Sequence, residues 1–138
     1  ISPEMHEEFD INYQKQLMGR FGLVYYGCCE PLHNKIEIVS KIPRLRKISI
    51  TPWADVDIAA EKIGSRYVLA SKPNPAFVAV NSFDPEPVRK EITRVLDACK
   101  RNGTPCEFVL KDISTANFKP ENLVQWEKTA METVLNYV

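Results

Sequence analysis

The stretch Phe21-Gly22-Leu23-Val24-Tyr25-Tyr26-Gly27-Cys28-Cys29-Glu30-Pro31 joins an apolar run to a tip that carries two thiols and a carboxylate. The run from Phe21 to Tyr26 is typical of a strand buried within a parallel sheet. The residues that follow lie where such a strand passes into a loop. In α/β folds the chemistry is concentrated at the carboxyl ends of the strands. We therefore expect the rest of the chain to support this tip or to supply neighbouring ones.

Strand and helix patterns alternate four times after an N-terminal helix. That helix is expected to begin at Ser2-Pro3-Glu4, with serine as its cap and proline in its first turn, and to end near Gly19 or Gly22. After the first strand, the expected segments are helix 31–42, strand 46–51, helix 56–63, strand 67–71, helix 84–102, strand 106–110 and helix 120–137. The alternation predicts one α/β domain over residues 1–138 with a parallel sheet. The sheet is either small and open or formed by four consecutive units of an eight-unit barrel.

Charge and hydropathy exclude several classes of partner. The 138 residues include 18 basic and 18 acidic side chains, so the chain has no net charge and does not resemble a dedicated nucleic-acid binder. The basic residues between 41 and 47 are expected to form a solvated rim. No apolar segment is long enough for a membrane span, and the N-terminus lacks a signal-peptide pattern. Four cysteines in such a chain favour reduced thiols and a cytoplasmic location.

Polar residues follow each expected strand, and parallel strands would bring them to one mouth. The candidate catalytic residues are Glu30, Asp55, Lys111 and Asp112. The candidate substrate-binding residues are Tyr26, Trp53, Lys72 and Asn74. The lysines would pair with carboxylates of a ligand or with Asp55 and Asp112, and Asp55 is also placed to cap a helix. His6 and His33 lie on expected helices and are predicted to be surface residues.

The order of these landmarks resembles the C-terminal half of the uroporphyrinogen decarboxylase and cobalamin-type methyltransferase superfamily. The segments that carry the resemblance are Ser2-Pro3-Glu4 with Phe9 and Tyr13 (like an SPE…F…PY helix), Val24–Cys29 (like a strand ending in His-x-Cys-Gly), Ile48–Asp55 with Ala59–Gly64 (like the next βα unit) and Tyr67–Pro75 (like a G-N-x-D-P strand). The resemblance implies a (β/α)8 barrel of more than twice this length. This chain would then be four of its eight units, a half-barrel preceded by a helix.

The methyltransferases of this superfamily hold zinc through a histidine, a cysteine and a later cysteine. The resemblance places Cys28 at the first cysteine, Tyr26 at the histidine and Lys111-Asp112 at the later cysteine. Cys29 and Glu30 are possible replacements, since thiolates and carboxylates both bind zinc. Neighbouring strand residues point to opposite faces, however, so Cys28 and Cys29 converge only if the chain turns there. Zinc at Cys28 and a corrinoid are thus the cofactors that the resemblance implies.

Several functions remain open. One is half of a methyltransferase-type barrel that acts on a small methylated molecule or a corrinoid and is inactive alone. Others are a non-catalytic ligand-binding module, a decarboxylase once completed by a missing half, and an open-sheet domain that binds a partner through its strand edges. A lone half-barrel would leave apolar faces and two sheet edges open. We therefore expect the missing N-terminal half, a second copy of the chain or a rearranged sheet, with neither nucleic acid nor membrane as a partner.

Overall fold

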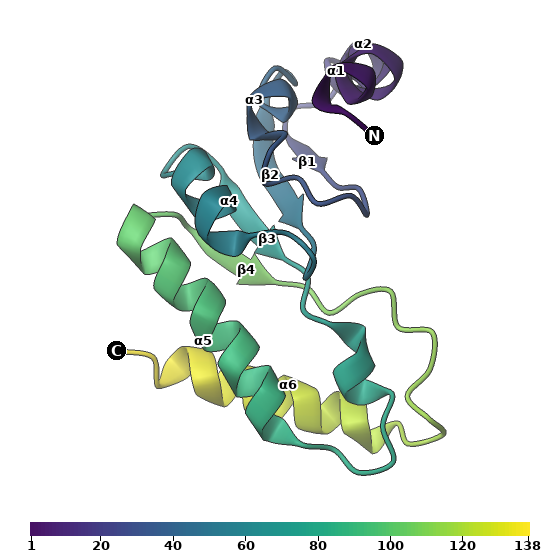
Figure 1. The fold of residues 1–138 in the computed structure, drawn as a ribbon, viewed down its shortest axis with the longest axis vertical. Helices are drawn as coiled ribbons and strands as arrows, with labels where there is room; N and C mark the ends of the chain where they lie inside the picture. The colour runs from purple at the N-terminus through teal and green to yellow at the C-terminus, as the bar shows by residue number, and fades with distance from the viewer.

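A fully parallel sheet in the order β1-β2-β3-β4 forms the centre of the computed structural model, which describes residues 1–138 (Figure 1). The strands are β1 (Val24–Tyr26), β2 (Leu45–Ile50), β3 (Val68–Ser71) and β4 (Cys106–Phe108). Each strand pairs with the next one along the chain. The predicted α/β class with a parallel sheet is therefore confirmed.

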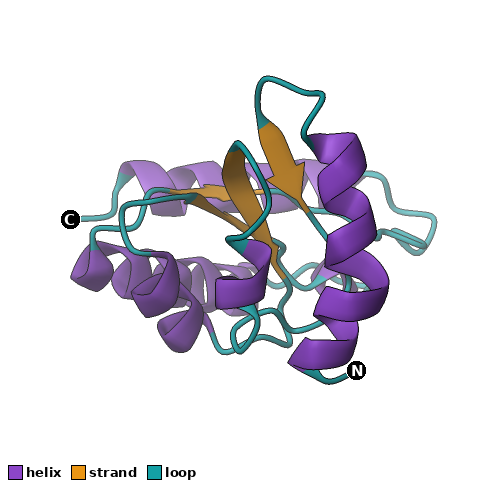
Figure 2. Cartoon of the chain, turned by 90° about the horizontal axis from the view of Figure 1, so that it is seen from above, coloured by secondary structure: helices purple, strands orange, loops and turns teal.

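Helices precede and connect the strands. In chain order they are α1 (Pro3–His6), the π-helical turn η1 (Glu7–Ile11), α2 (Asn12–Met18), α3 (Ile36–Val39), α4 (Val56–Ile63), the 3₁₀ turn η2 (Pro75–Val78), α5 (Pro85–Asn102) and α6 (Glu121–Leu135). The segments from α1 to α2 stand beside the β1 end of the sheet, and α5 and α6 lie toward β4 (Figures 1 and 2). None of the helices is long and apolar enough to cross a membrane.

The two faces of the sheet differ in what covers them. Tyr26, Ile48 and Leu69 are aligned in register and pack in one core with apolar residues of α3, α4 and α5. On the opposite face, Tyr25 is 47% exposed and Lys47 forms an ion pair with Glu107 across the sheet. Because side chains alternate along a strand, this second face carries every other residue of β1, β2 and β3. The sheet is thus covered by helices on one side only.

Local contacts explain where the element bounds depart from the prediction. The helix expected over 31–42 is limited to α3, because Lys35 has φ −122° and its N–H donates to Leu32 O in a separate turn. The last strand ends at Phe108 rather than at 110, although Val109 N still bonds to Ser71 O. The predicted ends of the longest helix hold: Asp84 caps α5, and Gly103 closes it with φ +61°.

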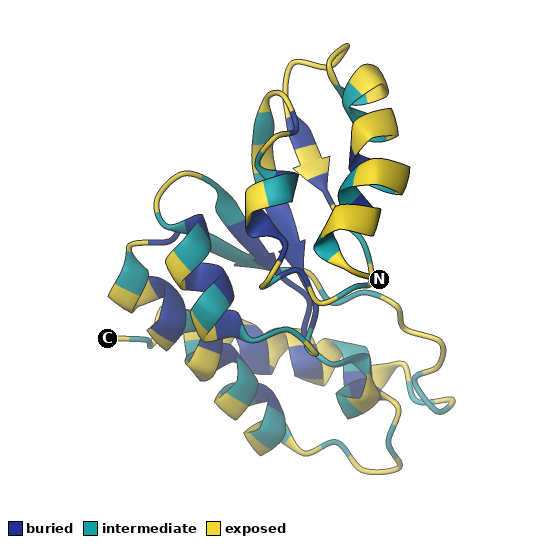
Figure 3. Ribbon diagram, turned by 45° about the horizontal axis from the view of Figure 1, so that its top comes forward, coloured by how far each residue is buried: buried dark blue, intermediate teal, exposed yellow.

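Apolar side chains remain uncovered at both ends of the sheet. Along the N-terminal helical segments, Met5, Phe9, Tyr13 and Leu17 recur every fourth residue and are all exposed (Figure 3). We call these four residues the N-terminal stripe. At the other end, a cleft of about 370 Å³ lies between β4 and α6 and is lined mainly by apolar residues such as Phe108 and Trp126. The exposed apolar side chains thus lie on the N-terminal helical segments and between β4 and α6, whereas the sequence predicted them on open strand faces.

Candidate functional site

Residues that follow all four strands meet in a cleft of about 150 Å³. Cys29 comes from the loop after β1, Thr51 and Trp53 from the loop after β2, Lys72 from the end of β3, and the pair Lys111 and Asp112 from the segment after β4. We call this space the strand-end cleft. The structure thus brings together Trp53, Lys72, Lys111 and Asp112, which were all predicted from the sequence to surround one mouth.

Thr51 and Lys72 line the cleft from the uncovered face of the sheet, and Gly27 and Ser49 lie next to them. A methyl carbon at Gly27 would lie 3.3 Å from Ser49 Cβ and 3.7 Å from Lys72 Nζ. The Lys72 ammonium therefore lies close to Gly27, and the tightest contact of a side chain at this position would be with Ser49. Ser49, Thr51 and Lys72 are all buried.

Two buried hydroxyls at the base of the cleft have no protein partner, and the buried Lys72 beside them has another lysine, Lys111, as its hydrogen-bonding neighbour. Ser49 Oγ and Thr51 Oγ1 lack any hydrogen-bond partner. Lys72 is only 6% exposed, yet no carboxylate lies within ion-pair distance of it. Buried lysines are almost always paired, and buried hydroxyls are nearly always hydrogen-bonded. This base consequently has the polar groups of a binding site without the protein contacts that would satisfy them.

The two lysines of the cleft have opposite electrostatic surroundings. Burial lowers the pKa of Lys72, and the neighbouring Lys111 lowers it further, against smaller opposing effects of Cys29 and Asp112. Lys111 lies on the rim, and its Nζ is 3.0 Å from Asp112 Oδ2. That hydrogen bond is the main cause that raises the pKa of Lys111. Lys111 is therefore a stable cation, whereas Lys72 is shifted toward its neutral form.

A second, wider cleft of about 300 Å³ adjoins the first and shares Trp53 and Asp112 with it. Asn74 lines this second cleft, but its Oδ1 accepts the N–H of Ala76 and thereby caps η2. Its backbone N–H donates to the Glu91 carboxylate at 3.1 Å. Asn74 is thus primarily a turn residue, and the exposed Trp53 ring stands between the two clefts.

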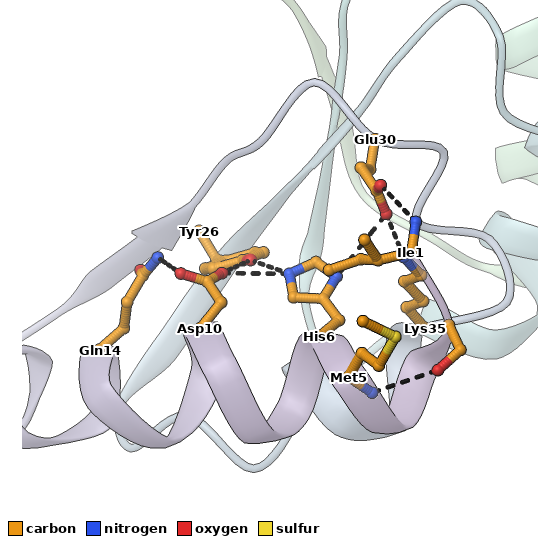
Figure 4. Close-up of polar contacts among 9 residues, drawn as sticks. Ile1, Met5, His6, Asp10, Gln14, Tyr26, Glu30 and Lys35 are labelled. Carbon is orange, nitrogen blue, oxygen red and sulfur yellow. Dashed lines mark hydrogen bonds and ion pairs between the residues drawn. The ribbon is translucent and has the colours of Figure 1, made fainter.

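Tyr26 and Glu30 lie elsewhere, and their predicted place at the mouth is corrected here. Tyr26 is on the helix-covered face, where its hydroxyl donates to Asp10 Oδ2 at 2.7 Å and lies 2.7 Å from His6 Nε2 (Figure 4). Glu30 forms ion pairs with Lys35 and with the amino group of Ile1 (Figure 4). The hydrogen bond from Lys35 is the main cause that lowers the Glu30 pKa to about 2. We call His6, Asp10, Tyr26, Glu30 and Lys35 the Tyr26 cluster.

His6 belongs to this cluster, so the prediction that it is a surface residue is wrong. It is 3% exposed because the N-terminal helix packs over β1 and turns this face inward. Its other ring nitrogen, Nδ1, is buried and is 3.9 Å from Glu30 Oε2, too far for a hydrogen bond.

Asp55 acts as the cap of α4, one of the two roles considered for it. Its Oδ1 accepts the N–H groups of Asp57 at 3.0 Å and of Ile58 at 3.2 Å. Its own backbone N–H donates to His33 Nδ1 at 3.3 Å. Asp55 lines neither cleft at the strand ends.

The surroundings of Cys28 do not fit a zinc site. Cys28 packs against the core, and burial is the main cause that raises the pKa of its thiol. Cys29 instead lines the strand-end cleft, so the two adjacent thiols do not converge. No group of three or more histidine, cysteine, aspartate or glutamate side chains is arranged to hold a metal ion.

Sequence reasoning missed Gly27, Ser49 and Thr51 as parts of the site. A signal was present in Ile48-Ser49-Ile50-Thr51, where apolar and hydroxyl residues alternate. Such a period of two places both hydroxyls on the face opposite the isoleucines. The chain matches no protein-family model and no curated protein sequence.

Proposed function

We propose that the strand-end cleft binds a small molecule that carries a carboxylate, with the cation of Lys111 and the N–H donors of Lys72 as its contacts. The observation that supports this proposal is the buried Lys72 without a carboxylate partner, beside two buried hydroxyls without partners. A ligand carboxylate is a pure acceptor and satisfies ammonium and hydroxyl donors together. Hydrogen bonds to a charged group contribute about 1.5–3 kcal/mol each, about twice the neutral kind.

The remaining walls favour an organic anion over a simple inorganic one. Trp53 offers a flat apolar surface beside the cationic base. Asp112, on the same rim, accepts hydrogen bonds from a hydroxyl or amino group of the ligand. A carboxylate ligand is the one predicted from the sequence for Lys72 and Lys111. Zinc-dependent methyl transfer is not part of the proposed function, because the residues that would bind zinc do not converge. With a carboxylate ligand, the domain is either a binding module or part of an enzyme.

Calorimetric titration of the 138-residue chain with succinate tests the proposal, with neutral succinamide as the matched ligand. We expect heat and saturable binding with succinate alone. Lys111→Met and Lys72→Met each weaken binding by about tenfold or more, since each removes a charge-assisted contact. Lys128→Met, an exposed lysine on α6, leaves binding unchanged. Equal weakening by Lys128→Met, or the absence of succinate binding, contradicts the proposal.

We propose in addition that a second copy of this chain covers both ends of the sheet, so that two half-barrels close into one eight-stranded barrel. The consecutive strand order and the helices on one face support this arrangement. The N-terminal stripe, together with the exposed side chains of Phe21, Leu23 and Tyr25, presents an apolar surface at the β1 end of the sheet. The apolar cleft between β4 and α6 is the complementary surface.

Light scattering after size-exclusion chromatography tests this association. We expect a dimer, and a monomer when Phe9 and Tyr13 of the N-terminal stripe are both replaced by serine. Phe118→Ser removes a fully exposed ring outside the stripe and leaves the dimer intact. A wild-type monomer at every concentration rules out the second copy and favours the N-terminal half of a longer chain as the cover.

A further inference from the structure

We infer that Lys72 forms an imine with the carbonyl carbon of a 2-oxo carboxylate, while Lys111 holds the carboxylate of the same molecule. This inference rests on the proposed function and names its substrate class. Two lysines of one small cleft therefore have different roles, because they differ in burial, in partners and in the groups around them.

Lys72 has the surroundings of a nucleophilic amine. A lysine attacks a carbonyl only as the neutral amine, and desolvation beside a second cation is a known way to provide that form. Lys72 is buried, has no carboxylate partner and has Lys111 as its neighbour. Lys111 itself is bound by Asp112 at 3.0 Å and is about one-third exposed, so it keeps its charge. The cation that binds the carboxylate, Lys111, thus follows β4, whereas the amine that attacks the carbonyl, Lys72, follows β3.

The groups that surround Lys72 come from every neighbouring element. The loop after β1 supplies Cys29, and the segment after β4 supplies Lys111 and Asp112. On the other side, Glu91 and Arg94 of α5 line a small cavity of about 50 Å³ together with Lys72. Glu91 is bound by the backbone N–H of Asn74, and burial raises its pKa. None of these carboxylates lies within ion-pair distance of Lys72, which leaves its Nζ available.

The base of the cleft has room and a hydrogen-bond donor for the tetrahedral intermediate. Lys72 Nζ lies close to Gly27, and Ser49 Oγ is 3.8 Å from the carbon that a side chain at Gly27 would begin with. The Thr51 hydroxyl lines the cleft and has no other partner. It can donate to the oxygen that develops charge when a carbonyl is attacked, as preorganised donors do in other active sites.

The covalent step balances without an oxidant, a reductant or a metal. The lone pair of neutral Nζ forms a bond to the carbonyl carbon, and the π electrons of C=O move to oxygen. The oxygen takes up a proton and the nitrogen releases one, which gives a carbinolamine. A further proton on the hydroxyl allows the C–O bond to break and water to leave, as nitrogen forms the C=N bond of an iminium ion. Asp112 and Cys29, which line the same cleft, are the nearby groups able to exchange these protons.

Borohydride trapping with pyruvate tests the inference on the 138-residue chain at neutral pH. Borohydride reduces an iminium to a stable secondary amine, and mass spectrometry of peptides locates the adduct. We expect one reduced pyruvyl group at Lys72 and none there in Lys72→Arg, which keeps the charge but not the nucleophile. Lys111→Met slows trapping by about tenfold or more because the carboxylate loses its anchor. Circular dichroism verifies that each variant is folded.

The outcomes separate the inference from the proposed function. Succinate binding without a pyruvyl adduct at Lys72 overturns the imine and leaves carboxylate binding in place. Adducts spread over surface lysines at the rate seen for Lys72 overturn it as well. The absence of both succinate binding and trapping overturns the two proposals together. Succinate binding that survives in Lys72→Arg while trapping disappears is the result that supports both.

Discussion

Two polar clusters at the carboxyl end of the sheet each contain one lysine that is 6% exposed. Lys35, in the Tyr26 cluster on the helix-covered side, forms an ion pair with Glu30. Lys72, in the strand-end cleft on the other side, has no carboxylate partner. The two lysines are equal in chemistry and burial, so only their partners distinguish them. Pairing, rather than burial, therefore distinguishes a polar group with a structural role from one that is available to a ligand.

The residues of the Tyr26 cluster come from three different segments of the chain. Its hydrogen bonds and ion pairs link the N-terminal helix, β1 and the loop before α3. Such a network stabilises one arrangement when its members satisfy each other. The strand-end cleft has the reverse property, since its buried hydroxyls and Lys72 cost stability in the absence of a ligand. Substitutions in the two clusters should therefore change the free energy of unfolding in opposite directions.

The largest effect is expected in the Tyr26 cluster. Tyr26→Ala should lower the free energy of unfolding by about 3–5 kcal/mol, because it removes a fully buried aromatic ring. Tyr26→Phe should lower it by about 1–2 kcal/mol, the part due to the bonds with Asp10 and His6. Urea denaturation measures both. Tyr25→Phe, on the same strand but facing the uncovered side, should have no effect; an equal loss there would remove the distinction between the faces.

The next largest change in the free energy of unfolding is expected when Lys72 and Lys35 are each replaced by methionine. Lys72→Met should raise the free energy of unfolding by about 1–2 kcal/mol, since it replaces an unpaired buried ammonium with an apolar chain of similar length. Lys35→Met should lower it, because Glu30 loses its main partner. Thermal and urea unfolding of the two variants provide the measurement. A loss of stability in both would show that Lys72 is structurally paired in solution.

Much of this fold, and about half of the site, follows from residues that act locally. Asp55 was predicted as a possible cap because it precedes a helical run, and the start of α5 was predicted near residue 84. Lys72 and Lys111 were predicted at the mouth because they follow apolar strands. The burial of His6 could not be predicted from the sequence, because it depends on how the N-terminal helix packs on β1. The place of Glu30 could not be predicted either, since Lys35 holds it through a turn that interrupts the expected helix.

The two clusters should also titrate in separate pH ranges. The pKa of Glu30 is about 2 in the folded protein against 4.5 ordinarily, so the unfolded chain binds more protons between these values. Stability should accordingly decline as the pH falls from about 4.5 toward 2. The pKa of Lys72 is lowered from 10.5, so the unfolded chain binds more protons below that pH, and stability should rise as the pH approaches it.

Unfolding titrations across pH identify the source of each slope. Glu30→Gln should flatten the acid slope alone, and Lys72→Met should flatten the alkaline rise alone. An alkaline rise that persists unchanged in Lys72→Met would mean that the lysine is solvated and charged in the folded protein. That outcome would also count against the neutral amine that imine formation requires.

The smallest effect separates two threonines that are both 6% exposed. Thr104 Oγ1 donates to Ala60 O at 2.9 Å, whereas Thr51 Oγ1 has no partner. Thr104→Val should lower the free energy of unfolding by about 1 kcal/mol, because the buried hydrogen bond to Ala60 O is lost and only the N–H of Gly64 still donates to that carbonyl. Thr51→Val should change it by less than about 0.5 kcal/mol, or raise it, since no protein bond is lost. In the presence of succinate, Thr51→Val should lose part of the ligand's stabilising effect, while Thr104→Val should keep all of it. Equal costs without ligand would mean that the Thr51 hydroxyl is satisfied in solution, and would weaken the distinction on which the binding site rests.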